Sequence, residues 1–381
     1  MIRLLTVIGA RPQIIKAAAI SRAIKESFAG VVEEKILHTG QHYDANMSQV
    51  FFDELDIPRP DYNLGVGSAP HGVQTARMTE GIEKVLTEEH FDGVVLYGDT
   101  NSTLAGAVAA SKIHVPVFHI EAGLRSYNMS MPEEINRIVC DHLSSILFAP
   151  TQTGYDNLIK EGLVDSPAVF GNGKKRIVYN SGDVMYDNSM YFSGIADKKS
   201  DILKTLGVAK DGFVLATIHR NNNTDEPKRL EAIFRALLDI AEKHDMTVVL
   251  PLHPRTKKML GVNLKAGTLE RVNSSDRLKI IPPASFFEII ELEKNARIVM
   301  TDSGGVQKEA FFFSKPCVIL RPETEWIEIV EHNAGIIADA DYDRIVTAYD
   351  SLVGRKVEFP KLFGDGKASN FILEKIVEYL S

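Results

Sequence analysis

Cysteine is scarce in this sequence: only Cys140 and Cys317 occur among its 381 residues. They are far apart, and each lies in an apolar or helical stretch, so we expect two buried thiols in a reducing compartment and no disulfide framework. The 11 histidines show no metal-site spacing together with cysteine or acidic partners. We therefore expect no catalytic metal.

Long apolar runs are also missing. No run approaches the roughly 18–20 apolar residues of a membrane span, and the apolar start of the chain is too short for a signal peptide and lacks a cleavage pattern. Lys and Arg number 43 against 51 Asp and Glu, and the resulting formal charge of −8 argues against general binding to nucleic acid or to an anionic membrane. We expect a cytoplasmic protein with neither nucleic acid nor membrane as a partner.

Two common nucleotide-binding signatures are lacking as well. Neither the phosphate-loop signature nor a properly placed GxGxxG occurs. Nucleotide hydrolysis and nicotinamide binding are therefore disfavoured, and no cofactor is expected.

What the chain does contain is a repeated alternation of short apolar runs and helix-length segments, which predicts parallel strands with crossover helices. Strands are expected at residues 4–8, 35–38, 93–97, 115–120 and 146–149, and, after a restart, at residues 213–218, 247–252, 278–281, 298–301 and 317–320. The length allows two or three domains. The simplest architecture is two doubly wound α/β halves with a boundary near residues 183–200.

Polar clusters follow many of these strands, at the edge where open parallel sheets bind ligands. The segment Asp302-Ser303-Gly304-Gly305 runs from a strand into a helix, so its backbone N–H groups and the positive helix end would face an anion such as a diphosphate. Glu309, further along that helix, could accept hydrogen bonds from ribose hydroxyls. The alternative is a tight turn followed by a surface glutamate.

Three carboxylates are candidates for acid/base work. Asp99 and Glu121 follow adjacent strands, and Glu133 lies at the start of a helix that begins near Pro132. Their closeness would raise some of their pKa values and let a carboxyl group donate a proton near neutrality. The alternatives are helix capping for Asp99 and Glu133 and a structural salt bridge for Glu121.

Cationic side chains follow strands too. His219 and Arg220 follow a strand of the second half, while Arg11 and Lys16 come after the first strand of the chain. Both pairs could stabilise a departing diphosphate. Phe286 could stack on a nucleobase, although packing at the start of a helix explains it equally well.

Taken in order, the motifs resemble the non-hydrolysing UDP-N-acetylglucosamine 2-epimerases, which have the two-domain B-type glycosyltransferase fold. The resemblance covers essentially the whole chain. The motifs are Gly9-Ala10-Arg11-Pro12, Thr39-Gly40-Gln41-His42, Gly98-Asp99-Thr100, Glu121-Ala122-Gly123-Leu124-Arg125, Pro132-Glu133-Glu134-Ile135-Asn136-Arg137, His219-Arg220, Asp302-Ser303-Gly304-Gly305-Val306-Gln307 and Thr324-Glu325. Gln13 stands where many family members have glutamate.

Other segments resemble one branch, the UDP-2,3-diacetamido-2,3-dideoxyglucuronate 2-epimerases, which make a manno-configured donor for surface polysaccharides. These segments include His42-Tyr43-Asp44 and Thr324-Glu325-Trp326-Ile327-Glu328. The carboxylate of such a sugar would need a cationic or amide partner. The candidates are Arg125, Arg137, Arg220 and Arg321.

The resemblance implies two Rossmann-like domains facing a cleft. Residues 1–185 would form the sugar and acid/base side and residues 186–362 the UDP side, while residues 363–381 would form a helix that packs back on the first domain. A homodimer is also implied. The implied site residues are Asp99, Glu121 and Glu133 for acid/base work, His219 for the leaving nucleotide, Arg11, Lys16, Ser303, Gly304 and Gly305 for the diphosphate, and Glu309 for the ribose.

The implied reaction is elimination of UDP to a 2-acetamidoglycal, followed by re-addition of UDP with a proton delivered to the opposite face of C-2. Asp99 is expected to be the base in the forward direction, and Glu121 or Glu133 the acid that returns the proton. A hydrolysing epimerase and a glycosyltransferase are rival enzymes of the same fold. A nucleotide-sugar-binding regulator without catalysis is the rival from another class.

Overall fold

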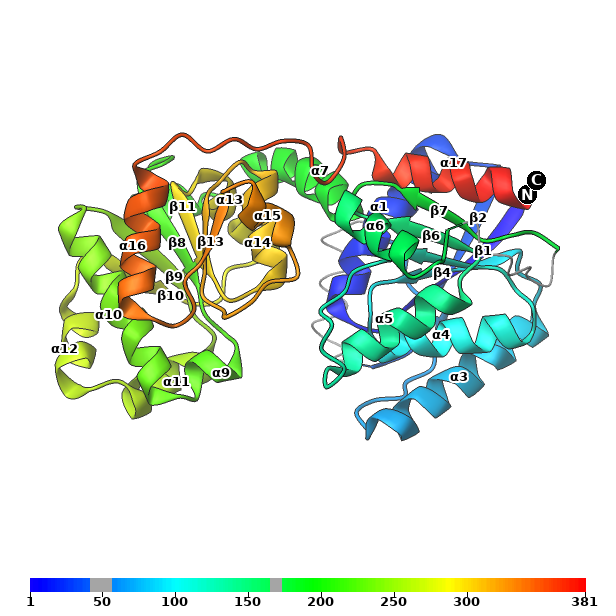
Figure 1. Ribbon diagram of the computed structural model, residues 1–381, viewed down its shortest axis with the longest axis horizontal. Helices are drawn as coiled ribbons and strands as arrows, with labels where there is room; N and C mark the ends of the chain where they lie inside the picture. The colour runs from blue at the N-terminus through cyan, green and yellow to red at the C-terminus, as the bar shows by residue number, and fades with distance from the viewer. Residues whose placement is uncertain (42–56, 165–172) are drawn as a thin grey trace. The chain divides into compact units, whose positions relative to one another are not determined.

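The computed structural model describes residues 1–41, 57–164 and 173–381, so His42, Tyr43 and Asp44 of the branch resemblance lie outside the described residues. The chain divides into two compact units (Figure 1). The N-terminal unit comprises Met1–Asn188 and Lys361–Ser381, and the C-terminal unit comprises Ser189–Pro360. No helix in the described residues is long and apolar enough to cross a membrane.

The N-terminal unit is built on a parallel sheet with strand order β3-β2-β1-β4-β5-β6-β7. Its elements are β1 (Ile2–Ile8), α1 (Arg11–Ser27), β2 (Val32–His38), β3 (Tyr62–Asn63), α3 (His71–Glu88), β4 (Gly93–Tyr97), α4 (Asn101–Lys112), β5 (Val117–Ile120), α5 (Pro132–Leu143), β6 (Ile146–Ala149), α6 (Gln152–Lys160), β7 (Ile177–Asn180) and α17 (Ala368–Leu380). Helix α7 (Val184–Lys199) continues from this unit into the next one.

Helices cover both faces of this sheet. Leu5, Val7 and Leu96 of the strands share one buried cluster with Met78 and Ile82 of α3, and Figure 1 shows α3, α4 and α5 together on that side. Because both faces are buried, β1, β4 and β6 are nearly continuous apolar runs without a polar alternation.

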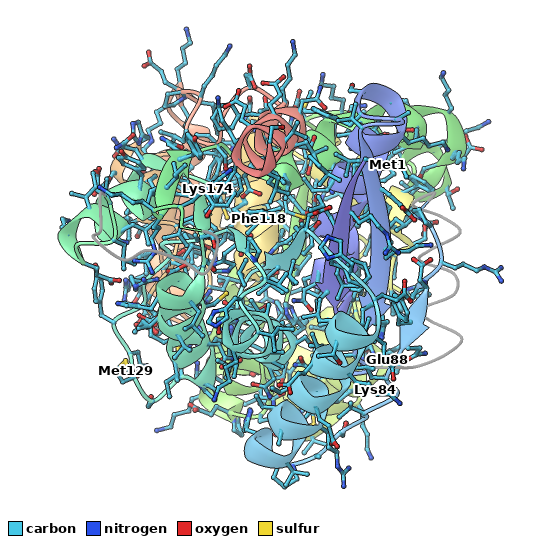
Figure 2. The ribbon with its side chains drawn as sticks, turned by 90° about the vertical axis from the view of Figure 1, so that its right-hand side faces the viewer. Met1, Lys84, Glu88, Phe118, Met129 and Lys174 are labelled. Atoms are coloured by element: carbon cyan, nitrogen blue, oxygen red, sulfur yellow. The ribbon has the colours of Figure 1, made fainter. Side chains whose placement is uncertain are left out.

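The last helix of the chain, α17, belongs to the N-terminal unit. The Asp187 carboxylate accepts hydrogen bonds from the backbone N–H groups of Ala368 and Ser369 at 3.1 and 2.8 Å, which satisfies two donors at the start of α17. Further along, Tyr379 packs edge-on against Phe118 of β5, with the ring centroids 5.9 Å apart. Phe118 is labelled in Figure 2. The expected return of the C-terminal helix to the first domain is confirmed.

The C-terminal unit repeats the same architecture with the strand order β10-β9-β8-β11-β12-β13, again all parallel. Its elements after α7 are α8 (Ile202–Leu206), β8 (Phe213–Thr217), α9 (Asn221–Thr224), α10 (Pro227–Lys243), β9 (Thr247–Pro251), α11 (Pro254–Asn263), α12 (Ala266–Ser274), β10 (Leu278–Ile281), α13 (Phe286–Asn295), β11 (Ile298–Thr301), α14 (Gly304–Phe312), β12 (Cys317–Ile319), α15 (Ile327–Glu331), β13 (Gly335–Ile337) and α16 (Tyr342–Val353).

Strand β8 illustrates how the side chains of this sheet pack into a core on each face. Val214 and Ala216 point into a core cluster with α10 and α16, whereas Phe213 and Leu215 point into a second cluster with α13 and α14. Successive side chains of a strand point to opposite faces of the sheet, so this one apolar run contributes to the core on each side. The expected fold class, α/β with two doubly wound parallel sheets, is confirmed.

Both sheets have a topological switch point, which is the place where the strand order reverses direction. It lies between β1 and β4 in the N-terminal unit and between β8 and β11 in the C-terminal unit. The carboxyl ends of the two strands at a switch point leave a crevice in which ligands of doubly wound sheets bind. The segments that leave these strands therefore form a candidate site in each unit.

Candidate active site

Gly9 and Gln13 connect the segments that follow β1 and β4. A Cβ atom on Gly9 would lie 2.0 Å from Oγ of Ser102 and 2.2 Å from Oγ1 of Thr39, so no larger residue fits there. Gln13 accepts the N–H of Gly9 at 2.9 Å and donates to the carbonyl of Tyr97 at 2.9 Å. A glutamate has no N–H group for the second bond, so glutamine suits this exit.

Asp99 lies just beyond β4 and does not cap the following helix, because the N-cap of α4 is Thr100. Its carboxylate is 2.6 Å from the Arg137 guanidinium, and its backbone carbonyl accepts a 2.9 Å hydrogen bond from Asn136. Burial raises the pKa of Asp99, Arg137 and Lys16 lower it in part, and Glu121 raises it again. The net pKa lies above the ordinary aspartate value, which favours proton exchange closer to neutrality.

Glu121, just beyond β5, has a strained backbone with φ of 71°. This left-handed conformation costs a non-glycine residue on the order of 1–3 kcal/mol, and such strain is concentrated at functional sites. Its carboxylate forms a 2.7 Å ion pair with Lys16. The salt bridge considered as an alternative is therefore present, and it also brings a cation to Asp99.

Helix α5 carries two neighbouring glutamates with different surroundings. Glu133, in the first turn, is exposed. Glu134 is fully buried, accepts the N–H of Tyr127 at 2.8 Å and forms a 2.7 Å ion pair with Arg137. Arg137 therefore joins Glu134 to Asp99, which fixes the guanidinium beside the acid/base candidate. Arg11 begins α1 with an exposed side chain.

In the C-terminal unit, His219 follows β8 and Asp302 follows β11. The imidazole Nδ1 of His219 lies 3.0 Å from Oδ1 of Asp302. The ring is 56% exposed, whereas the carboxylate beneath it is completely buried. Burial opposes the charge on Asp302, but His219, the N–H of Arg220 and the amide of Asn223 hold its pKa below the ordinary value. Asp302 is thus a fixed anion that orients His219.

The N-terminus of α14 presents Ser303, Gly304 and Gly305. Ser303 is the N-cap and accepts the N–H of Val306 at 3.4 Å. Gly305 is exposed, and a Cβ atom on Gly304 would lie 3.4 Å from the Glu325 carboxylate. Free N–H groups and the helix dipole at this end suit a negatively charged ligand.

The remaining candidates of the C-terminal unit are more deeply packed. Arg321 forms a two-pronged ion pair with Glu325, at 2.8 and 3.0 Å. Phe286 is only 8% exposed and packs edge-on against Phe192, so its ring belongs to an aromatic cluster. Glu309 is half-buried on α14. Burial and the carboxyl of Glu309 raise the pKa of Glu293 well above the ordinary value.

The whole chain is similar to proteins of known function. A family model for UDP-N-acetylglucosamine 2-epimerase matches residues 25–377. The chain belongs to this epimerase family. The UDP-2,3-diacetamido-2,3-dideoxy-D-glucuronate 2-epimerase of Pseudomonas aeruginosa is 47% identical over 381 residues, which cover 100% of this chain and 99% of the relative. A UDP-N-acetylglucosamine 2-epimerase homolog of Methanococcus maripaludis is 44% identical over 373 residues, or 98% of each chain.

The solved structures of the epimerase family agree. The UDP-GlcNAc 2-epimerase of Methanocaldococcus jannaschii, crystallised with UDP-GlcNAc and UDP, superposes with a TM-score of 0.82 at 39% sequence identity. The match covers 99% of this chain and 100% of that chain. The resemblance found in the motifs, to the family and to its diacetamido branch, is confirmed, and the protein is an isomerase.

Sequence reasoning missed several groups of this epimerase. The motifs contain three further residues to which the sequence assigned no function, Glu134, Asp302 and Gln13. Glu134 holds Arg137 and Asp302 holds His219, whereas Gln13 joins the exits of β1 and β4. The spacing of Glu134 and Arg137, three residues apart on one helix face, is a signal that could have paired them. Asp302 follows β11 just as Asp99 follows β4, and that parallel was also readable from the sequence.

Proposed function

We propose that this epimerase-family protein interconverts the C-2 epimers of a UDP-linked acetamido sugar without metal and without net hydrolysis. The observation that carries the proposal is the environment of Asp99. It is a carboxyl with a raised pKa, held by Arg137 beside Glu121 at the switch point of a doubly wound sheet. Such a group can exchange a proton with a sugar carbon once that carbon has been made acidic.

Departure of UDP makes that proton transfer feasible. The C-2 proton is not adjacent to a carbonyl, so a carboxylate alone could not remove it near neutral pH. In our proposal, Ser303, Gly304, Gly305, Arg11 and Lys16 stabilise the diphosphate as charge develops on it. His219, oriented by Asp302, assists the leaving nucleotide. Glu309 binds the ribose.

The bonds change as follows. Asp99 takes the C-2 proton, the C–H electron pair forms the C-1=C-2 double bond of a 2-acetamidoglycal, and the C-1–O bond breaks with its pair going to the β-phosphate of UDP. The return reaction adds UDP at C-1 and a proton at the opposite face of C-2. Glu121 or Glu133 delivers that proton. Glu121 is paired with a cation and Glu133 is exposed, so separate Glu→Gln variants distinguish them.

We propose UDP-2,3-diacetamido-2,3-dideoxyglucuronate as the preferred substrate over UDP-N-acetylglucosamine. The supporting relative is 47% identical along the whole chain. Of the four candidate arginines for the sugar carboxylate, Arg125 and Arg137 are buried in ion pairs with Asp141 and Asp99, and Arg321 is bound to Glu325. Arg220 is exposed and forms no ion pair with a described carboxylate, so we assign the sugar carboxylate to it.

The wider role follows from the resemblance. We propose a cytoplasmic homodimer whose product supplies surface polysaccharide synthesis, such as that of lipopolysaccharide or capsule. The buried free thiols of Cys140 and Cys317 support a reducing compartment. Light scattering on the purified protein tests the dimer, because a monomer at micromolar concentration would contradict it.

Product analysis tests the proposed reaction. Each UDP-sugar is incubated with the protein without an acceptor, and the products are followed by NMR. We expect a mixture of two epimeric UDP-sugars and no free sugar. Accumulation of free sugar would indicate a hydrolysing epimerase, turnover only with an added acceptor a transferase, and binding without turnover a regulator.

The choice of substrate is tested with Arg220→Met. We expect this variant to lose more kcat/KM on the diacetamido-uronate than on UDP-N-acetylglucosamine, which has no sugar carboxylate. An equal loss on both substrates contradicts the assignment of Arg220. A large preference of the unaltered protein for UDP-N-acetylglucosamine contradicts the branch.

A further inference from the structure

A buried histidine outside the proposed catalytic set lies directly beneath the acid/base carboxylates. His119 is on β5, two residues before Glu121, and is completely buried. Its ring makes two short contacts. Nδ1 lies 2.7 Å from Oδ1 of Asp141, and Nε2 lies 2.8 Å from the carbonyl oxygen of Gly98.

Both partners of the His119 ring are acceptors. A backbone carbonyl cannot donate a hydrogen bond, and Asp141 is held as a carboxylate by a 2.7 Å ion pair with Arg125. Each ring nitrogen must therefore carry a proton, which makes His119 an imidazolium ion. Burial by itself lowers the pKa of His119, whereas the ion pair and hydrogen bond with the Asp141 carboxylate raise it, and the net pKa lies above the ordinary histidine value.

Asp141 connects this ring to the second carboxylate. Its other oxygen, Oδ2, accepts the backbone N–H of Gly123 at 3.2 Å. Gly123 has φ of 78° and ends the strained turn that begins at Glu121. Arg125, which balances Asp141, is itself paired with Glu161 at 2.7 Å. His119, Asp141 and Arg125 thus form a buried charged network beneath Asp99 and Glu121, and Glu161 extends it to the surface.

The Gly98 peptide is the other end of the network. Gly98 has φ of 61°, and its N–H donates to the carbonyl of Ile120 at 3.0 Å. With His119 on its carbonyl, this residue is held on both sides immediately before Asp99. A Cβ atom here would lie 3.3 Å from Nζ of Lys16 and 3.7 Å from Oε1 of Glu121, so the peptide also lies against the neighbouring ion pair.

We propose that His119 and Asp141 are positioning residues of the epimerisation reaction. The protonated ring of His119 fixes the peptide that precedes Asp99, while Asp141 fixes both that ring and the turn after Glu121. Neither residue exchanges a proton with substrate. The same two buried residues therefore position both Asp99 and Glu121. This inference rests on the proposed function, which assigns acid/base work to these two carboxylates.

Two substitutions at His119 separate positioning from mere occupancy of the core. His119→Gln places an amide N–H near the position of Nε2 and can still donate to Gly98. His119→Asn reaches only as far as Nδ1 and loses that bond. We expect His119→Asn to lower kcat by about 10²-fold, the effect of a misplacement on the order of 1 Å, with KM and UDP affinity nearly unchanged. His119→Gln should recover most of the loss, and equal activities of the two variants would overturn the proposal.

The charge on the ring is tested by ¹⁵N NMR of histidine-labelled protein, with the His119 signals identified by their absence in His119→Gln. We expect both ring nitrogens to be protonated from pH 6 to pH 9. The Asp141→Asn variant should convert the ring to a neutral tautomer. A neutral ring in the unaltered protein at pH 7 overturns the proposal. If the protein turns over no UDP-sugar, the proposed function fails, but the protonation of His119 is still measured.

Discussion

The two sheets share the order of six strands, and each has an aspartate after the corresponding strand, but the surroundings of the two aspartates shift their pKa values in opposite directions. Asp99 follows β4 and has a raised pKa, chiefly because of burial. Asp302 follows β11 and has a lowered pKa, because His219, a backbone N–H and the Asn223 amide outweigh burial. The sheet topology determines where each site lies, and the local hydrogen-bond donors determine whether the pKa of its aspartate is raised or lowered.

The division of labour follows from this difference. In the N-terminal unit, a carboxyl that can gain and lose a proton lies beside a cluster of charged side chains. In the C-terminal unit, a permanently ionised aspartate orients a histidine next to a helix N-terminus. We infer that the first unit carries proton transfer and the second holds the leaving nucleotide.

The largest expected effect comes from removing the proton acceptor. Asp99→Asn should lower kcat by about 10³-fold, within the range of general acid–base catalysis. UDP affinity, followed by titration calorimetry, should stay unchanged because Asp99 is not assigned to the nucleotide. The matched variant Asp302→Asn should instead weaken UDP binding. If both variants affected the same parameter, the comparison would fail.

A smaller loss is expected on the nucleotide side. His219→Ala should lower kcat by about 10²-fold, as removal of one preorganised hydrogen-bond donor does. His219→Asn, which can still bond to Asp302, should retain more activity. Steady-state rates on the same UDP-sugar measure both, and an alanine variant as active as the unaltered protein would remove His219 from the mechanism.

The pH profile sharpens the comparison further. A base must be deprotonated, so a raised pKa of Asp99 places the acidic limb of kcat/KM at higher pH than an ordinary aspartate would. Arg137 lowers that pKa, so Arg137→Gln should move the limb upward by about one pH unit. Arg137→Lys keeps the charge and serves as the control. A limb that moved downward in Arg137→Gln would contradict the assignment of Asp99 as the base.

The smallest effect concerns stability. Ser303→Ala removes the N-cap of α14 and should lower the free energy of unfolding by about 1 kcal/mol. Trp326 is the only tryptophan of the chain and is buried in the C-terminal unit, so its fluorescence in urea reports this unit. Far-UV circular dichroism reports the helices of both units, so the part of its transition that the tryptophan signal does not follow belongs to the N-terminal unit and should keep its midpoint. A shift of both transitions would show that the two units do not unfold independently.

Most central strands of both sheets were predictable because each is an apolar run buried on two faces. For β2, only residues 35–38 were predicted, because Glu33 and Glu34 interrupt its apolar run. The sequence did not reveal β3, β7 and β13, which lie at sheet edges. β3 has only Tyr62 and Asn63, and β13 spans Gly335–Ile337. An edge strand pairs on one side only, so a short, partly polar segment suffices and leaves no periodic signal.

The candidate residues at the strand exits could be located from sequence, but their partners could not. That Arg137 would face Asp99, or that Asp141 would lie under His119, depends on how α5 packs against the sheet. The i, i+4 spacing of Arg137 and Asp141 places both on one helix face, but does not say which strand they meet. Tertiary packing supplied that information.

The most direct measurement of the central claim is the fate of the C-2 hydrogen in heavy water. Reisolated substrate and product are examined by NMR after partial turnover of the UDP-linked diacetamido sugar. Our account predicts deuterium at C-2 of the product, because the proton is lost to one carboxyl and regained from another that exchanges with solvent. Epimerisation with the original hydrogen retained at C-2 in every product molecule would contradict it.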